Sequence, residues 1–294
     1  MALSENEQVH TKPARDRGSM REWLSLILVI GGLFFFVRWF LFEPFRIPSE
    51  SLLPTLEVGD MVVVSKFSYG YGDFSLDFDL PFMPDNRLLG GSPKHGEIAV
   101  FRHPRSKRNL IKRIIGLPGD TVQMINGQLF LNGEPMPQKL VGAASNTSLS
   151  NKPAQLIDEQ LIDRQGEVMA AYQILNFADT VFDNTPRLTI PADTYFFMGD
   201  NRDNSGDSRS NRDLGLVHKR FLIGKAEIVL FSLNIQAHPE DLYFWAYWNP
   251  FRWGRFVKIL GGGLTQGWLA LLWRGKMVKS ALRTSEHNVA GIDQ

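Results

Sequence analysis

The chain has 294 residues, of which 44% are hydrophobic and 21% are charged, proportions typical of a folded protein. Its net charge of +1 gives no strong field that would attract nucleic acid, so we expect no nucleic-acid partner. The sequence contains no cysteine, which excludes disulfides, thiolate nucleophiles, Cys-ligated zinc and iron–sulfur clusters.

The first predicted element is a membrane-spanning helix over 22–42. The stretch from Trp23 to Phe42 holds 20 residues with one charge, Arg38, whose long stem can reach the interface. A cleavable secretory signal is the alternative, but the apolar stretch is long and no small-x-small cleavage site follows it. Basic residues before the helix place 1–21 in the cytoplasm by the positive-inside rule, so everything after residue 43 is expected outside the cytoplasm. These residues are Lys12, Arg15, Arg17 and Arg21.

Beyond the helix, short apolar runs separated by turn residues predict a mainly β domain over 43–275. Asn126 and Gly127 tolerate positive φ and predict a two-residue hairpin. The expected strands are 61–67, 97–102, 110–115, 121–125, 128–131, 194–198 and 225–232.

Two later regions do not follow this pattern. The stretch from about 133 to 190 is polar and predicts an irregular inserted subdomain. Five of the seven tryptophans lie in 245–273, interleaved with cations, which favours either the membrane surface or ordinary core packing. A second span there is disfavoured by Lys258, three consecutive glycines and Gln266. We expect 276–294 to be a loosely ordered tail.

The segment FRIPSESLLPTL places two serines between two prolines shortly after the predicted span. In extended backbone, Ser49 and Ser51 share a face, and Pro48 and Pro54 stiffen the segment. Such a pair can supply an attacking oxygen and an oxyanion donor. The alternative is a pair of turn or capping serines.

A nucleophilic serine needs a base. The six histidines are scattered, and spacing alone does not exclude a Ser-His-Asp triad. The run LIKRIIG offers Lys112 and Arg113, and the period of a strand does not choose between them. Arginine stays protonated, whereas burial among apolar neighbours lowers the pKa of a lysine well below about 10.4. Lys112 is therefore the candidate base, unless it is a surface lysine on an edge strand.

The loop MGDNRDNSGDSRSNRDLG, 198–215, is rich in alternating charges. An EF-hand with Gly206 as its sixth residue would require glutamate where Arg212 stands, so we expect no metal site. The alternation instead predicts a cross-bridged, rigid loop of the kind that supports a catalytic pair.

Together, the segments 48–70, 111–120 and 198–209 resemble the signature boxes of bacterial type I signal peptidases, the Ser-Lys proteases also called leader peptidases. They occur in the family's order behind a membrane anchor, and the resemblance covers roughly 22–232. The departures are Leu52, where methionine is usual, Leu110, where an aromatic residue is frequent, and Glu50, where glycine is also common.

The resemblance implies roles for individual residues. Ser51 would be the nucleophile, Lys112 the general base, Ser49 an oxyanion donor, and Ser205 a partner that orients the lysine amine. The residues implied to stiffen the site are Asp200, Arg202, Asp207, Arg209 and Arg113. The residues implied to line shallow substrate pockets are Phe45, Ile47, Pro48, Leu56 and Ile111. No cofactor is implied.

The resemblance also implies an activity. Members of the family remove signal peptides from exported preproteins at small-x-small sequences, through an acyl-enzyme, at the outer (periplasmic) face of the bacterial plasma (inner) membrane. The expected partners are therefore preproteins and the lipid bilayer. One alternative is a self-cleaving Ser-Lys repressor protease, which would carry a DNA-binding domain where this chain has an apolar helix. Another is a membrane-anchored all-β binding module without catalysis.

Overall fold

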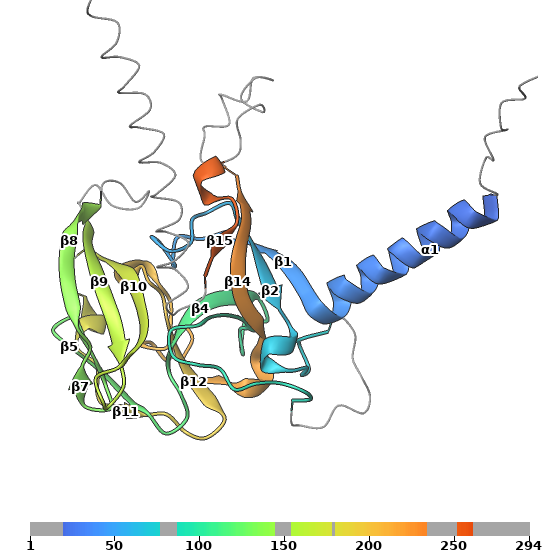
Figure 1. The fold of residues 1–294 in the computed structure, drawn as a ribbon. Coiled ribbons are helices and arrows are strands. Elements are labelled where there is room, and N and C mark those ends of the chain that lie inside the picture. Colours follow the sequence, from blue (N-terminus) through green and yellow to red (C-terminus); the bar gives the residue numbers. More distant parts are fainter. Residues whose placement is uncertain (1–19, 77–86, 145–153, 178–179, 234–251, 261–294) are drawn as a thin grey trace, which may run out of the picture. The chain divides into compact units, whose positions relative to one another are not determined.

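A computed structural model describes residues 20–76, 87–144, 154–177, 180–233 and 252–260 of the chain (Figure 1). The chain divides into two compact units, Met1–Arg38 and Trp39–Gln294, which are described separately. The expected tails 1–21 and 276–294 lie almost entirely outside the described residues, and so does most of the tryptophan-rich region 245–273.

The N-terminal element is helical throughout. The α-helix α1, Met20–Phe36, continues into a π-helical turn, Val37–Leu41. Together they form a helix of 22 residues that is long and apolar enough to cross a membrane by length and composition. The expected span 22–42 coincides with this helix apart from its ends.

The largest sheet belongs to the second unit and is antiparallel throughout (Figure 1). In spatial order the strands of this sheet are β1 (Phe42–Arg46), β2 (Asp60–Ser65), β14 (Leu222–Ser232), β3 (Ile98–Arg102), β4 (Asn109–Gly116), β12 (Thr194–Met198) and β13 (Val217–His218), with β15 (Lys258–Ile259) on β14. Each strand that the sequence predicted after the span is present in the structure, which confirms the prediction of a mainly β domain.

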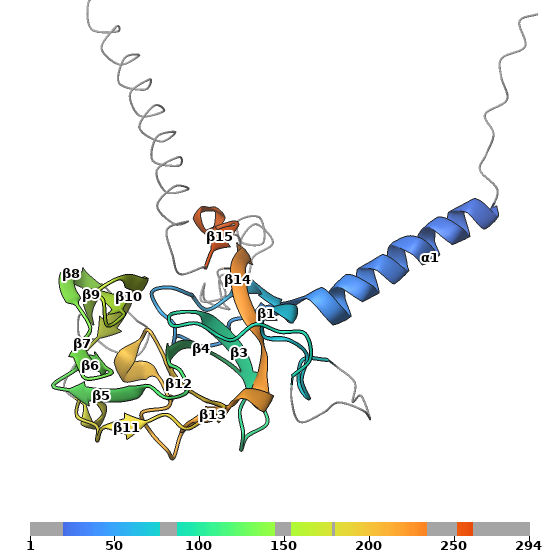
Figure 2. The same cartoon turned by 60° about the horizontal axis from the view of Figure 1, so that its bottom comes forward.

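A second sheet contains the predicted hairpin (Figure 2). Asn126 and Gly127 have φ values of 49° and 76° and connect its two central strands, as the Asn-Gly pair predicted. The strands lie in the order β11 (Leu188–Thr189), β5 (Thr121–Ile125), β6 (Gln128–Leu131) and β7 (Glu134–Pro135).

The region 133–190 is more regular than we expected. It contains a three-stranded sheet in the order β10 (Val168–Asn176), β9 (Ala154–Ile162) and β8 (Gln138–Ala144). Leu161 and Ala170 are buried in one apolar cluster with Ile115 and Met198 of the main sheet. The prediction of an irregular segment was therefore wrong, because alternate residues of β9 are buried despite the polar composition. Its status as an inserted subdomain stays a prediction.

Five short 3-10 helices complete the described elements. They are η2 (Phe67–Tyr69), η3 (Val181–Asp183), η4 (Arg202–Asn204), η5 (Lys219–Phe221) and η8 (Trp253–Arg255).

An apolar core lies directly beneath the two serines. Ile47, Leu52 and Leu56 are at most 1% exposed and pack with Val62 and Val229 of the main sheet. Complete burial of each such side chain contributes about 1.5 to 3 kcal/mol. The serine segment is thus anchored to the sheet on both sides of its hydroxyls.

Candidate active site

The serine segment leaves β1 and folds into a turn. Ile47 donates its backbone N–H to the carbonyl of Asp60 at 2.9 Å, and Gly59 donates to the carbonyl of Ile47 at 2.9 Å, which closes the loop between them. We expected extended backbone here, but the chain bends at residues 49–50 and turns from 51. Leu56 donates to the carbonyl of Leu52 at 2.9 Å, so the two leucines lie on one side of a helical turn and are both buried.

The two hydroxyls are nevertheless close. The Oγ atoms of Ser49 and Ser51 are 3.5 Å apart. Ser51 is 8% exposed, whereas Ser49 is exposed. The hydroxyls of Ser49 and Ser51 are therefore adjacent, as predicted, but a turn and not extended backbone brings them together.

Backbone contacts tie Ser51 to the charged loop after β12. Asn201 donates its backbone N–H to the carbonyl of Ser51 at 3.1 Å, and its side-chain amide donates to the carbonyl of Glu50 at 3.1 Å. A Cβ at Gly199 would overlap both the carbonyl oxygen of Ser51 and the Oγ of Ser205. Glycine at 199 is thus what permits this close approach.

Lys112 lies in β4, beside the start of the loop that contacts Ser51. Its neighbour Arg113 pairs in register with Met198, so Lys112 lies where β4 meets the start of the Gly199 loop. The side chain is 5% exposed. Burial lowers the pKa of Lys112 to about 8, against the opposing effect of the carboxylates of Asp207 and Asp200. At mildly alkaline pH the amine is therefore a base.

The described residues give Nζ of Lys112 neither a hydrogen bond nor an ion pair. No hydrogen bond joins it to Ser51 or Ser205 in the part of the chain that the structure describes. Ser205 Oγ is itself buried and has no hydrogen-bond partner among those residues. Nζ of Lys112 and Oγ of Ser205, which the resemblance pairs, are thus both buried without a hydrogen bond among the described residues. Catalytic hydrogen bonds are often long or unformed in the absence of substrate.

The three described histidines form hydrogen bonds or ion pairs with residues other than Ser51. His95 contacts Asp120 at 2.7 Å, and His103 contacts the carbonyl of Asp213 at 2.8 Å through its Nε2. His218 accepts a hydrogen bond from the backbone of Arg220 at 3.2 Å. None of these three histidines is hydrogen-bonded to Ser51, so the described part of the chain contains no triad around this serine.

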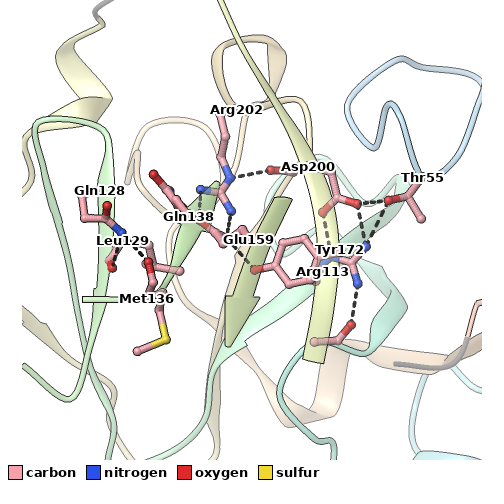
Figure 3. A network of polar contacts seen from close by, with 12 residues as sticks. Thr55, Arg113, Gln128, Leu129, Met136, Gln138, Glu159, Tyr172, Asp200 and Arg202 are labelled. Carbon is pink, nitrogen blue, oxygen red and sulfur yellow. Dashed lines mark hydrogen bonds and ion pairs between the residues drawn. The ribbon is translucent and has the colours of Figure 1, made fainter. Parts of the chain in front are cut away.

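Arg113 lies next to Lys112 in β4 and holds the loop carboxylate behind the site (Figure 3). It makes a bidentate pair with Asp200, with N–O distances of 2.7 and 2.6 Å, and both side chains are buried. Thr55, four residues after Ser51, donates its hydroxyl to Asp200 at 2.5 Å. This pair therefore links the strand that carries Lys112 to the segment that carries Ser51.

A second buried pair joins the charged loop to the three-stranded sheet (Figure 3). Arg202 makes a bidentate contact with Glu159 of β9, which is fully buried. Glu159 also accepts hydrogen bonds from Tyr172 and Gln138, each at 2.8 Å. Glu159 is not among the residues predicted from the sequence, because its partner Arg202 lies far away along the chain. The signal available was its position on the buried side of an alternating strand.

The third pair lies within the loop itself. Arg209 contacts Asp207 through two hydrogen bonds of 2.9 Å and also donates to the carbonyl of Arg202. Asp207 in turn accepts the backbone N–H of Gly199 at 3.1 Å. Arg209 and Asp207 therefore bridge the loop to itself, as the alternating pattern predicted. Asp200 and Arg202 instead pair with residues of β4 and β9.

The residues implied to bind substrate occupy one area beside the serines. Ile47, Leu56 and Ile111 belong to a single apolar cluster, and Phe45 packs against it. Ile47 and Leu56 are essentially inaccessible, whereas Pro48 is exposed and Ile111 is 9% exposed.

A family model described as signal peptidase, peptidase S26, matches residues 20–231. The chain belongs to this family. A signal peptidase I of Pseudomonas fluorescens is 40% identical over 208 residues, which cover 67% of each chain. A signal peptidase I of Rickettsia canadensis is 32% identical over 242 residues, covering 80% of this chain and 88% of the relative.

Among solved structures, a signal peptidase I from Enterococcus faecalis V583 aligns with 46% of this chain and 97% of its own, at 25% identity and a TM-score of 0.29.

Membership of the signal peptidase S26 family has two direct consequences. The chain is a serine endopeptidase, a hydrolase, which decides against the binding module without catalysis. The apolar helix, taken together with the family, indicates a membrane anchor.

Proposed function

We propose that this enzyme removes N-terminal signal peptides from exported preproteins by means of a Ser-Lys dyad and an acyl-enzyme. The observation that carries the proposal is the buried amine of Lys112, with a pKa of about 8, at the loop whose Gly199 packs against Ser51. A lysine of this kind is neutral often enough near neutral pH to accept a proton from a serine hydroxyl.

In the first half of the reaction, Nζ of Lys112 takes the proton of Ser51 Oγ as that oxygen attacks the scissile carbonyl. Ser49, whose Oγ is 3.5 Å from that of Ser51, donates a hydrogen bond to the developing oxyanion. The ammonium of Lys112 then gives its proton to the leaving amine, and the mature protein departs from the acyl-enzyme.

In the second half, Lys112 takes a proton from water, which attacks the ester carbon of Ser51. The proton returns to Ser51 Oγ as the signal peptide is released. Ser205, whose Oγ is buried beside Gly199 and lacks a hydrogen-bond partner among the described residues, orients the amine by a hydrogen bond. The ion pairs of Asp200, Arg202, Asp207, Arg209 and Arg113 keep this arrangement rigid.

Substrate binding is assigned to the apolar area beside the serines. Phe45, Pro48 and Ile111 line shallow pockets for small side chains, and Ile47 and Leu56 form the layer beneath them. Small pockets suit the small-x-small sequences that precede signal-peptide cleavage sites.

The proposed topology is single-pass, with 1–21 in the cytoplasm and 22–42 in the bilayer. The catalytic domain, 43–275, lies on the outer (periplasmic) face of the bacterial plasma (inner) membrane, and about 133–190 forms an inserted subdomain. The basic residues before the helix support this orientation. The partners are signal-peptide-bearing preproteins and the bilayer.

The test is incubation of the detergent-solubilised chain with a purified preprotein, with the cut position read by mass spectrometry. We expect one cut after a small-x-small sequence. Ser51→Ala and Lys112→Ala should abolish this cut, because they remove the nucleophile and the base. Lys112→Arg should abolish it too, because arginine cannot accept the proton. Ser106→Ala, at an exposed loop serine, is the matched control. Cleavage by Lys112→Arg at the wild-type rate would rule out the neutral-amine mechanism.

A further inference from the structure

The last helical turn before β1 accepts hydrogen bonds from the segment that follows β2. Carbonyls at the end of a helix lack partners within the helix. Here Tyr71 donates its hydroxyl to the carbonyl of Phe40 at 2.7 Å, and Nζ of Lys66 donates to the carbonyl of Trp39 at 3.4 Å. The backbone N–H of Lys66 donates to the carbonyl of Leu41 at 2.9 Å. Three consecutive carbonyls are therefore satisfied by two residues of one segment.

Lys66 is unusual among the cations of the described chain because it is fully buried yet has no part in the proposed chemistry. Its side chain is 0% exposed, and its amine pairs with Glu43 of β1 at 2.8 Å. An ammonium buried this deeply is strongly unfavourable unless it is paired and hydrogen-bonded. Lys66 meets that condition by contacting both the helix end and the first strand.

The held turn leads straight to the serines. β1 begins at Phe42, the residue after Leu41, and pairs with β2 along its whole length. The backbone bond from Ile47 to Asp60 then continues this pairing up to the Ser51 turn. Each step of the chain from the last helical turn to the nucleophile is thus fixed to the main sheet.

We propose that Lys66 and Tyr71 are positioning residues that hold residues 39–41 in place and so set the depth of Ser51 relative to the bilayer surface. This inference rests on the proposed function. A signal peptide embedded in the same bilayer presents its cleavage site at a defined depth. A nucleophile held at a fixed distance from residues 39–41 meets that site at a high effective concentration, whereas one that is loosely tethered to them samples many depths.

The experiment compares two substrates of the full chain. One is a preprotein co-reconstituted with the enzyme in lipid vesicles, and the other is a short soluble peptide with the same cleavage site, assayed in detergent. The variants are Tyr71→Phe and the double variant Lys66→Met with Glu43→Gln, which removes both members of the buried pair. Tyr69→Phe is the matched control, because its hydroxyl donates to Glu97 at 3.0 Å and not to the held turn.

We expect all variants to cleave the soluble peptide within about twofold of wild type. In vesicles, Tyr71→Phe should process the preprotein about fivefold more slowly, the effect of losing one net hydrogen bond. The double variant should be slowed about tenfold or more and should produce secondary cuts near the main one.

Two outcomes would overturn this inference alone. One is processing in vesicles by both variants at the rate of Tyr69→Phe, with a single cut. The other is an equal loss on both substrates, which would mean that the substitutions damage the site itself. If the wild-type chain cut neither substrate after a small-x-small sequence, the proposed function would fail first and this inference with it.

Discussion

Replacing Lys112 by methionine should remove an unfavourable charge from the folded protein. The side chain is 5% exposed, and burial lowers its pKa from 10.5 to about 8 although Asp207 and Asp200 oppose the change. A tenfold change in a protonation equilibrium corresponds to about 1.4 kcal/mol, so the difference between the two values amounts to about 3 kcal/mol. Methionine has a similar length and no charge. Lys112→Met should therefore raise the free energy of unfolding by about that amount.

The stability gained by Lys112→Met should decrease as the pH rises. The folded-state pKa lies below the unfolded value, so at pH below about 8 the amine is charged in both states and the penalty is fully present. As the pH rises from about 8 to 10.5, the folded state releases the proton first and the penalty disappears. The advantage of Lys112→Met is thus largest below pH 8 and vanishes above 10.5.

The assay is denaturant unfolding of the full chain in detergent micelles across this pH range. Lys225→Met is the control of opposite sign: burial lowers the pKa of Lys225, but its ion pairs with Glu97 and Glu227 raise it overall. Lys225→Met should therefore lose stability at neutral pH. A Lys112→Met variant that is no more stable than wild type at neutral pH, or whose added stability does not change with pH, would show that the buried charge carries no such penalty.

Three further predictions concern the surroundings of Ser51. Ser49→Ala should lower turnover by about 10² to 10³ with unchanged thermal unfolding, because it removes one oxyanion donor; wild-type turnover would remove that role. Gly199→Ala should lower turnover by about 10², because its Cβ would displace the Ser51 backbone. Gly206→Ala should leave turnover unchanged, because the atom nearest to the added Cβ lies 3.4 Å away. Equal turnover in the two variants would show that the close approach at Gly199 does not matter for catalysis. Glu159→Ala should lower the free energy of unfolding by about 3 to 5 kcal/mol in a denaturant titration, because Arg202 is left as an unpaired buried cation; a loss below about 1 kcal/mol would show that the pair does not stabilise the fold.

Local patterns in the sequence predicted much of the framework. The strand runs, the Asn126-Gly127 hairpin and the apolar helix are all present, because each depends on residues that are close together in the chain. The alternation of side chains along a β-strand did not indicate which of Lys112 and Arg113 is buried, and in the structure both are buried. The reason is that β4 lies between β3 and β12 with both faces covered: Ile111, on the face of Arg113, belongs to one apolar cluster, and Ile114, on the face of Lys112, belongs to another.

The two errors have different causes, one local and one distant along the chain. The prolines around Ser51 indicated extension, yet the spacing of Leu52 and Leu56 already matched the helical turn that buries both. The stretch 133–190 was predicted to be irregular from its polar composition, yet one of its polar residues, Glu159, is buried because Arg202 from another part of the chain pairs with it. No local pattern contains that ion pair.

The claim that a neutral amine activates Ser51 is tested most directly by the pH dependence of the single-turnover rate of acylation, measured with a preprotein and the full chain in detergent. The account predicts that this rate rises about tenfold for each tenfold fall in proton concentration at low pH and levels off above about 8, the pKa of Lys112. A rate that does not change through this range, or a rise centred near the ordinary lysine value of 10.5, would contradict it.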